Sequence, residues 1–124
     1  CGMARNTEGL KQAIAEVQAL KKEFWSDVKI PGEISEMNPE LDKANRVADF
    51  IELGELMCID ALNRNESCGG HFREEMQTEE GEAKRDDANY SYVAAWEFKG
   101  EHNWELHKEE LTFDVAKPSQ RSYK

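Results

Sequence analysis

A cysteine and a histidine close together are the first residues in this sequence that could carry chemistry. Cys68 and His71 flank Gly69-Gly70, which reproduces half of a zinc knuckle. A structural zinc ion needs four ligands, and the other two histidines, His102 and His107, do not complete the set at a usual spacing. The sequence therefore predicts no metal site, and Gly69-Gly70 is better explained as a tight turn that requires positive φ.

No segment has the pattern of a nucleotide-binding loop or of a general acid–base pair. The glycines form neither a G-x-G-x-x-G sequence after a strand nor a phosphate-binding loop, so the sequence has no flavin fingerprint. Adjacent carboxylates recur, but 26 acidic residues make such pairs expected on a solvated surface. They are Glu74-Glu75, Glu79-Glu80, Asp86-Asp87 and Glu109-Glu110. We assign no catalytic, cofactor-binding or metal-binding residue to this chain.

One glycine-containing segment, Glu66 to Asp87, concentrates polar groups that suit an interface. Its notable residues are Ser67, His71, Arg73, Arg85, Asp86 and Asp87. Long loops are usually either functional or mobile. A charged loop of this kind can attach one domain to another, and the competing interpretation is a plain surface loop.

Two long helices are expected to position this loop. In residues 7–26 apolar residues recur at steps of three and four, and Asn6 or Thr7 can cap the first turn. Asn38-Pro39 is typical of an N-cap followed by proline at the first helical position, and the second helix is expected over 39–63. Residues predicted to be buried are Leu10, Ile14, Val17, Phe24, Val47, Ile51 and Met57.

The second helix has a wider apolar stripe than one partner helix would need. Gly54 interrupts it, which indicates that another backbone approaches closely there. Part of the stripe needs a further partner, which a C-terminal hairpin, a second copy of the chain, or both could supply. We therefore expect that the chain can form a homodimer.

A β-hairpin is expected after the loop that spans 64–89. Tyr92, Trp96 and Phe98 alternate with polar residues, and a turn is expected around Gly100. The apolar parity changes between Leu106 and Leu111, which predicts a β-bulge near residues 108–110. The hairpin is expected over about 90–115, followed by a polar tail over 116–124. The fold class predicted is mainly α with a C-terminal hairpin and an extended tail.

Size and charge restrict the classes of function. The 124 residues are enough for one domain, and a net charge of −10 disfavours binding to nucleic acid or to anionic lipid. The odd number of cysteines, three, favours a reducing, cytoplasmic setting. The chain begins with Cys1, which is expected of a processed or excised chain and also of a mature lipoprotein.

Three motifs resemble the C-terminal domain of the succinate dehydrogenase and fumarate reductase flavoprotein family. Residues 66–75 read ESCGGHFREE and precede Arg85-Asp86-Asp87, similar to that family's E-S-R-G-x-H-x-R-x-D and R-D-D. Residues 46–57 resemble its R-V-x-x-x-x-E-L-x-x-L-M helix, and residues 118–123 its P-x-x-R-x-Y ending. Cys68 stands where the family usually has arginine, and Gly70 where it has alanine. This form resembles the branch that uses one dihaem cytochrome b anchor and menaquinone.

The resemblance implies a fold and a setting that composition could not indicate. It implies a spectrin-like three-helix bundle whose first helix is truncated here, forming a single C-terminal domain over 1–124 of a larger flavoprotein. The full-length subunit would bind FAD covalently and interconvert succinate and fumarate, coupled to quinone, while this chain would be structural, inactive and without a cofactor. Partners implied are the flavin-binding and capping domains, an iron–sulfur subunit and a cytochrome b membrane anchor. The complex would lie peripherally at the cytoplasmic face of the bacterial membrane.

The resemblance also suggests where this chain meets the flavin domain. The expected polar interface consists of His71, Arg73, Arg85, Asp86, Asp87, Arg121 and Tyr123. Two other interpretations stay open. One is the C-terminal domain of L-aspartate oxidase, which has a similar bundle and an E-S-R-G-type motif. The other is a free-standing lipoprotein-like or adaptor module that begins at Cys1.

Overall fold

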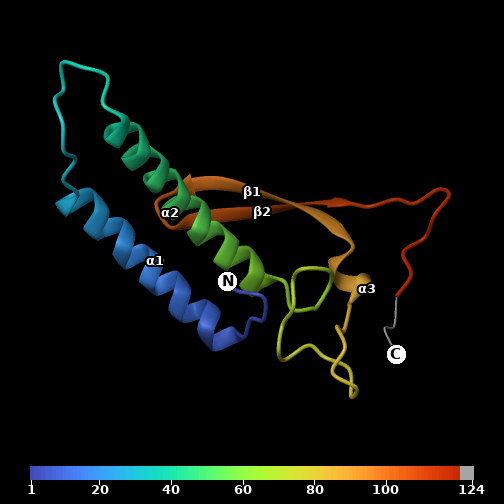
Figure 1. Cartoon of the computed structure of the whole chain (residues 1–124). Coiled ribbons are helices and arrows are strands. Elements are labelled where there is room, and N and C mark those ends of the chain that lie inside the picture. Colours follow the sequence, from blue (N-terminus) through green and yellow to red (C-terminus); the bar gives the residue numbers. More distant parts are fainter. Residues whose placement is uncertain (121–124) are drawn as a thin grey trace. The chain divides into compact units, whose positions relative to one another are not determined.

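The chain forms two compact units, Cys1–Asn63 and Arg64–Lys124. A computed structural model describes residues 1–120. The first unit, here called the helical unit, contains α1 (Thr7–Asp27) and α2 (Pro39–Asn63), which lie side by side as an antiparallel pair (Figure 1). The second, here called the loop–hairpin unit, contains α3 (Asp87–Tyr90), β1 (Tyr92–Gly100) and β2 (Asn103–Glu110). The predicted fold class, mainly helical with a C-terminal hairpin, is confirmed.

Asparagine side chains fix the start of both long helices. Asn6 has extended backbone angles, and its Oδ1 accepts a hydrogen bond from the backbone N–H of Gly9 at 2.8 Å. Asn38 Oδ1 accepts from the backbone N–H groups of Glu40 and Leu41, at 3.0 and 3.3 Å, and Pro39 opens α2. Each cap satisfies N–H groups that have no partner inside the helix. No helix among residues 1–120 is both long enough and apolar enough to cross a membrane.

The contact between α1 and α2 includes polar groups as well as apolar ones. Leu10 of α1 and Ile51 of α2 are buried as predicted. Gln18 Nε2 donates to Oε1 of the buried Glu55 at 2.8 Å, and Lys21 Nζ lies 3.6 Å from Glu52. These contacts place the Ile51–Glu55 side of α2 toward α1.

The prediction that Val47 and Met57 are buried is wrong. Their exposed fractions are 44% and 52%, and Phe50 and Leu53 beside them are also exposed. At 100° per residue these four residues share a face of α2 that is turned away from the Ile51–Glu55 side, so α1 does not cover them. We call Val47, Phe50, Leu53 and Met57 the α2 apolar face. Gly54 lies within it, and among the described residues nothing comes within 4 Å of a Cβ built there, so the close backbone approach predicted is not found.

The hairpin has its irregularity at the turn and not where the sequence suggested. Trp96 pairs with Leu106 and Phe98 with Trp104, while the register shifts between Phe98 and Gly100. The positive φ angles of Gly100 and His102, 126° and 56°, accommodate this turn. No bulge occurs at 108–110, because β2 ends at Glu110 and Leu111 lies beyond the ladder. The change of apolar parity therefore marks the end of the strand.

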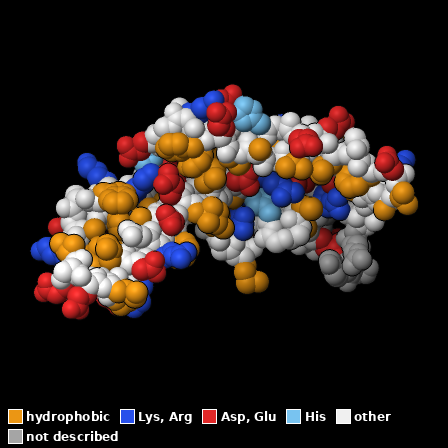
Figure 2. All heavy atoms as spheres, turned by 90° about the horizontal axis from the view of Figure 1, so that it is seen from above, with side chains coloured by type: hydrophobic (Ala, Val, Ile, Leu, Met, Phe, Trp, Pro, Cys, Tyr) orange, Lys and Arg blue, Asp and Glu red, His pale blue; other side chains and the backbone are white. Residues whose placement is uncertain are grey.

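Exposed apolar groups are spread over the surface of both units. Figure 2 shows apolar side chains interspersed with acidic and basic ones, and the largest exposed groups include Trp25, Phe50 and Phe98. In the hairpin, the Phe98 and Trp104 rings meet edge to face with centroids 5.1 Å apart. Lys108 Nζ lies 4.3 Å from the centroid of the Tyr92 ring. Such cross-strand pairs stabilise the two-stranded sheet.

Candidate functional site: a buried polar loop network

Hydrogen bonds between distant positions organise the loop that precedes β1. Ser67 Oγ accepts from the backbone N–H of Arg73 at 2.8 Å and lies 3.2 Å from the Arg73 carbonyl oxygen, to which it can donate. The Ser67 N–H donates to the carbonyl of Lys84 at 2.9 Å, and the Lys84 N–H donates to that of Met76 at 3.1 Å. Ser67 is fully buried, so these bonds replace the water that its polar groups would otherwise need.

The predicted glycine turn is confirmed at residues 68–71. The backbone N–H of Cys68 donates to the carbonyl of His71 at 2.8 Å, and the N–H of His71 donates back at 3.1 Å. Gly69 takes a φ of 58° between them, a conformation that side chains with a Cβ rarely adopt. The segment is therefore a two-residue reversal, which explains Gly69-Gly70 without a nucleotide or a metal.

Glu66, near the start of this loop, is a buried carboxylate that binds two separate parts of it. Its Oε1 accepts from Nε of Arg64 at 2.8 Å and also pairs with the Arg64 Nη2 at 2.6 Å. Its Oε2 accepts from the backbone N–H of Asp86 at 2.8 Å. The side chain is 2% exposed, whereas that of Arg64 is 36% exposed. Glu66 thus joins the start of the loop to its end, twenty residues later.

His71 and Arg73 are also buried, and both contact the backbone of Arg64. His71 Nε2 lies 2.7 Å from the Arg64 carbonyl oxygen, so Nε2 carries the proton that it donates. Arg73 is 2% exposed, its Nε donates to Glu75 at 3.2 Å, and its Nη1 lies 3.5 Å from the same Arg64 carbonyl. Because His71 Nε2 donates its proton to this carbonyl, it cannot at the same time bind a metal ion or accept a proton.

Arg85 and Asp87 form the more exposed edge of the network. Nε and Nη2 of Arg85 both donate to Oδ1 of Asp87, at 2.9 and 2.7 Å, and Nη1 donates to the carbonyl of Ser119 at 3.1 Å. The bond to Asp87 raises the pKa of the Arg85 guanidinium above its ordinary value. Asp86 uses its backbone to bind Glu66 and its carboxylate to accept from Asn89 at 2.8 Å.

An open cavity of about 470 Å³ lies against this edge, entirely within the loop–hairpin unit. Arg64, Arg85, Tyr90 and Tyr92 line it together with Phe113. Each of the two guanidinium groups already pairs with a carboxylate, Glu66 or Asp87. The cavity is therefore a mixed apolar and charge-neutralised surface, which suits contact with protein better than capture of a small anion.

The described residues bring together five of the seven predicted interface residues. His71, Arg73, Arg85, Asp86 and Asp87 belong to the one network, whereas Arg121 and Tyr123 lie outside the described residues. The role of all seven residues at an interface stays a prediction. Sequence analysis gave no role to Glu66 or Arg64, although Glu66 is the first residue of the ESCGGHFREE motif, and that position was a signal that could have indicated one.

Comparison with known proteins identifies the family. A family model described as "Fumarate reductase flavoprotein C-term" matches residues 1–123. The chain belongs to this family. A fumarate reductase flavoprotein subunit from a Serratia species is 32% identical over 90 residues, which is 73% of this chain and 14% of that protein. The same subunit from Proteus vulgaris is 28% identical over 123 residues, 99% of this chain and 20% of that protein.

Solved structures agree with membership of the fumarate reductase flavoprotein C-terminal family. A variant of the FrdA subunit of Escherichia coli quinol fumarate reductase superimposes with a TM-score of 0.78 at 25% identity, covering 97% of this chain and 20% of that chain. A quinol–fumarate reductase with menaquinol gives a TM-score of 0.78 at 24% identity over 96% of this chain and 20% of that chain, which supports the fold alone. The chain thus spans about a fifth or less of the length of these relatives.

Proposed function

We propose that this chain is the C-terminal structural domain of a flavoprotein subunit that interconverts succinate and fumarate, coupled to quinone. The match of the family model over residues 1–123 carries this proposal. The described residues add a physical reason for a structural role, because the buried polar side chains of the loop, Glu66, His71 and Arg73, are engaged in holding its shape. Catalysis then belongs to the remaining four fifths of the subunit.

The flavin is held outside this chain. Both long helices begin at an asparagine cap, whose side chain already binds the N–H of Gly9 in α1 and the N–H groups of Glu40 and Leu41 in α2, where a phosphate would otherwise bind. The described residues also have no glycine-rich turn that leads from a strand into a helix, which a flavin dinucleotide needs. These residues do not fit FAD, and we place the covalently bound FAD in the flavin-binding domain of the full-length subunit.

The partners proposed are those of a respiratory complex. The solved relatives are quinol–fumarate reductases, and one contains menaquinol, which supports an iron–sulfur subunit and a cytochrome b anchor as partners of the full subunit. Such a complex would hold the subunit peripherally at the cytoplasmic face of the bacterial membrane. The net charge of −10 disfavours direct binding of this chain to anionic lipid or nucleic acid.

The α2 apolar face is proposed to pack against the rest of the flavoprotein subunit. Its four residues are between 44% and 66% exposed, although they follow the spacing of a buried helix face. Relatives of this chain are about five times longer, so the full subunit supplies ample chain to cover this face. When the rest of the subunit is missing, the same face of a second copy of this chain can cover the α2 apolar face. We therefore expect the isolated chain to form a homodimer.

The contact with the flavin domain is proposed to use the exposed edge of the loop network. His71 and Arg73 are buried and act as positioning residues that hold the loop in shape. Arg85 and Asp87 have side-chain exposures of 24% and 46%, which leaves them accessible beside the cavity. Arg121 and Tyr123 complete the proposed interface on the basis of the sequence motif alone.

Substitution of Arg85 in the full-length subunit tests this interface. Arg85→Ala removes the planar group, whereas the control Arg85→Lys keeps the charge but loses the two-pronged bond to Asp87. We expect weaker flavin retention in the alanine variant, an intermediate effect in the lysine variant, and the same melting temperature for both isolated chains within a few degrees. Normal flavin retention in both variants, or equal destabilisation of the isolated chain, would exclude an interface role.

A further inference from the structure

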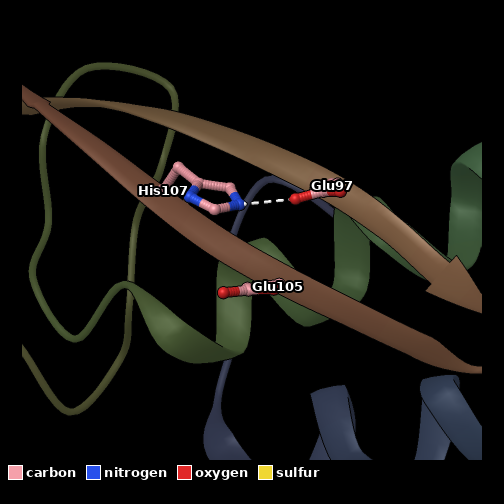
Figure 3. A group of neighbouring side chains, drawn as sticks. All are labelled: Glu97, Glu105 and His107. Atoms are coloured by element: carbon pink, nitrogen blue, oxygen red, sulfur yellow. Dashed lines mark hydrogen bonds and ion pairs between the residues drawn. The ribbon is translucent and has the colours of Figure 1, made fainter.

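We propose that Glu97, Glu105 and His107 form a surface site for a divalent transition metal ion of the zinc type. Their ligand atoms all lie within 4.8 Å of one another on one face of the hairpin. Glu97 comes from β1, and Glu105 and His107 come from β2, as Figure 3 shows. Nothing in the sequence pattern indicated this site, because it depends on the pairing of the two strands.

The strand register creates the cluster. Glu97 lies directly opposite Glu105, and His107 lies opposite Ala95, so the imidazole sits diagonally from Glu97. The small Ala95 leaves the ring room to turn toward Glu97, and His107 Nε2 lies 2.8 Å from the Glu97 carboxylate. Since residues that are two apart on a strand share a face, all three side chains project to the same side.

Two opposed glutamates are unfavourable unless a cation lies between them. Here that cation is Lys99, whose Nζ is 2.7 Å from Glu97 and 3.1 Å from Glu105. Lys99 and His107 lower the pKa of the Glu97 carboxyl, with Lys99 contributing most. Both carboxylates thus already bind one positive charge, and Lys99 would compete with a metal ion for them.

The chemistry of the donor set selects the metal. One imidazole nitrogen with two carboxylate oxygens matches the preference of Zn²⁺ and its neighbours, whereas Ca²⁺ needs six or more oxygen ligands. Tetrahedral bond lengths of about 2.0–2.1 Å separate neighbouring ligand atoms by roughly 3.4 Å. The 2.8 Å contact between His107 Nε2 and Glu97 must therefore open, and the wider separations, up to 4.8 Å, must close, which rotation of exposed side chains allows. Nε2 must also give up the proton that it donates to Glu97, because a metal ion binds the lone pair of the imidazole nitrogen. Because all three ligands are about half exposed, the other positions of the ion are left to water.

Zinc titration followed through the histidine side chains by NMR tests the site. Cys1, which is exposed, and Cys68, which is half-buried, should first be alkylated, because accessible thiols would compete for the metal. We expect saturable shifts of the His107 imidazole and of the backbone amides of Glu97 and Glu105. His102, on the same hairpin, is the internal control and should not shift in the same concentration range. An excess of Ca²⁺ should leave the zinc-bound signals unchanged.

Three variants make the test decisive. His107→Gln should weaken zinc binding by roughly tenfold or more, because loss of a ligand costs at least as much as loss of a group that supports one. The matched control His102→Gln should bind as the parent chain does. Lys99→Gln should bind more tightly, because it removes the competing cation. Absence of a saturable His107 shift, equal losses in both histidine variants, or unchanged affinity in the Lys99 variant would overturn the proposal.

Discussion

Glutamine in place of Glu66 should loosen the whole loop network. Glu66 accepts from Arg64 through one oxygen and from the backbone of Asp86 through the other. Glutamine keeps the shape but has a single oxygen, so its NH₂ group must face one of these two donors. At least one charge-assisted hydrogen bond is therefore lost, and such bonds contribute about 1.5–3 kcal/mol each.

The expected cost is about 2 kcal/mol. Breaking a fully buried ion pair can cost about 3–5 kcal/mol. Arg64 is more than a third exposed, so water resolvates its charge and the penalty falls below that range. A loss of about 2 kcal/mol corresponds to a factor of about 30 in the population of the open loop.

Native-state amide exchange measures this loss where it occurs. The N–H groups of Ser67 and Lys84 donate to loop carbonyls and report on loop opening. Both should exchange about 30-fold faster in Glu66→Gln. Glu79→Gln, an exposed position in the same loop, is the control and should change stability by less than about 0.5 kcal/mol. Unchanged exchange of Ser67 and Lys84 in Glu66→Gln would refute the central role of this carboxylate.

Four further predictions concern the helices and the isolated chain. Asn6→Ala should cost about 1 kcal/mol through loss of the α1 cap, measured by thermal melting, and no change would mean that water serves the Gly9 N–H equally well. Gly54→Ala should stabilise the isolated chain by about 1 kcal/mol in urea unfolding, because nothing occupies the space beside it among the described residues. In the full subunit the same substitution should be neutral or destabilising if another segment packs there. Sedimentation should show self-association of the isolated chain that Phe50→Ser reduces, whereas a monomer at high concentration would contradict it. The isolated chain should be colourless and inactive, and a flavin absorption band that survives gel filtration would contradict this.

Local signals in the sequence predicted the elements well. Periodicity and the Asn6 and Asn38 caps placed both helices within one residue of their observed bounds, since these signals act over a few neighbouring residues. The alternation around Trp96 likewise indicated β1. The one helical turn of α3 was not predicted: its first three residues were assigned to the loop and Tyr90 to the start of the hairpin, because four residues carry too little periodicity to recognise.

Long-range features could not be predicted in the same way. The exposure of Val47 and Met57 depends on which side of α2 meets α1, and periodicity does not say how many sides are covered. The bond from Asp86 to Glu66 joins positions twenty residues apart, and no local pattern encodes it. The cluster of Glu97, Glu105 and His107 depends on the strand register, which the turn around Gly100 sets. The alternation of apolar residues does not reveal this register, and it predicted the irregularity at the C-terminal end of β2 instead of at the turn.

The central claim is tested most directly by the activity of the full-length subunit that contains this chain. Purified subunit should carry bound flavin and interconvert succinate and fumarate with an artificial electron donor or acceptor, and it should not oxidise L-aspartate. Flavin-dependent oxidation of L-aspartate would contradict the proposed function in favour of the related oxidase. A native protein that consists of this domain alone, without flavin or activity, would contradict it in favour of a free-standing module.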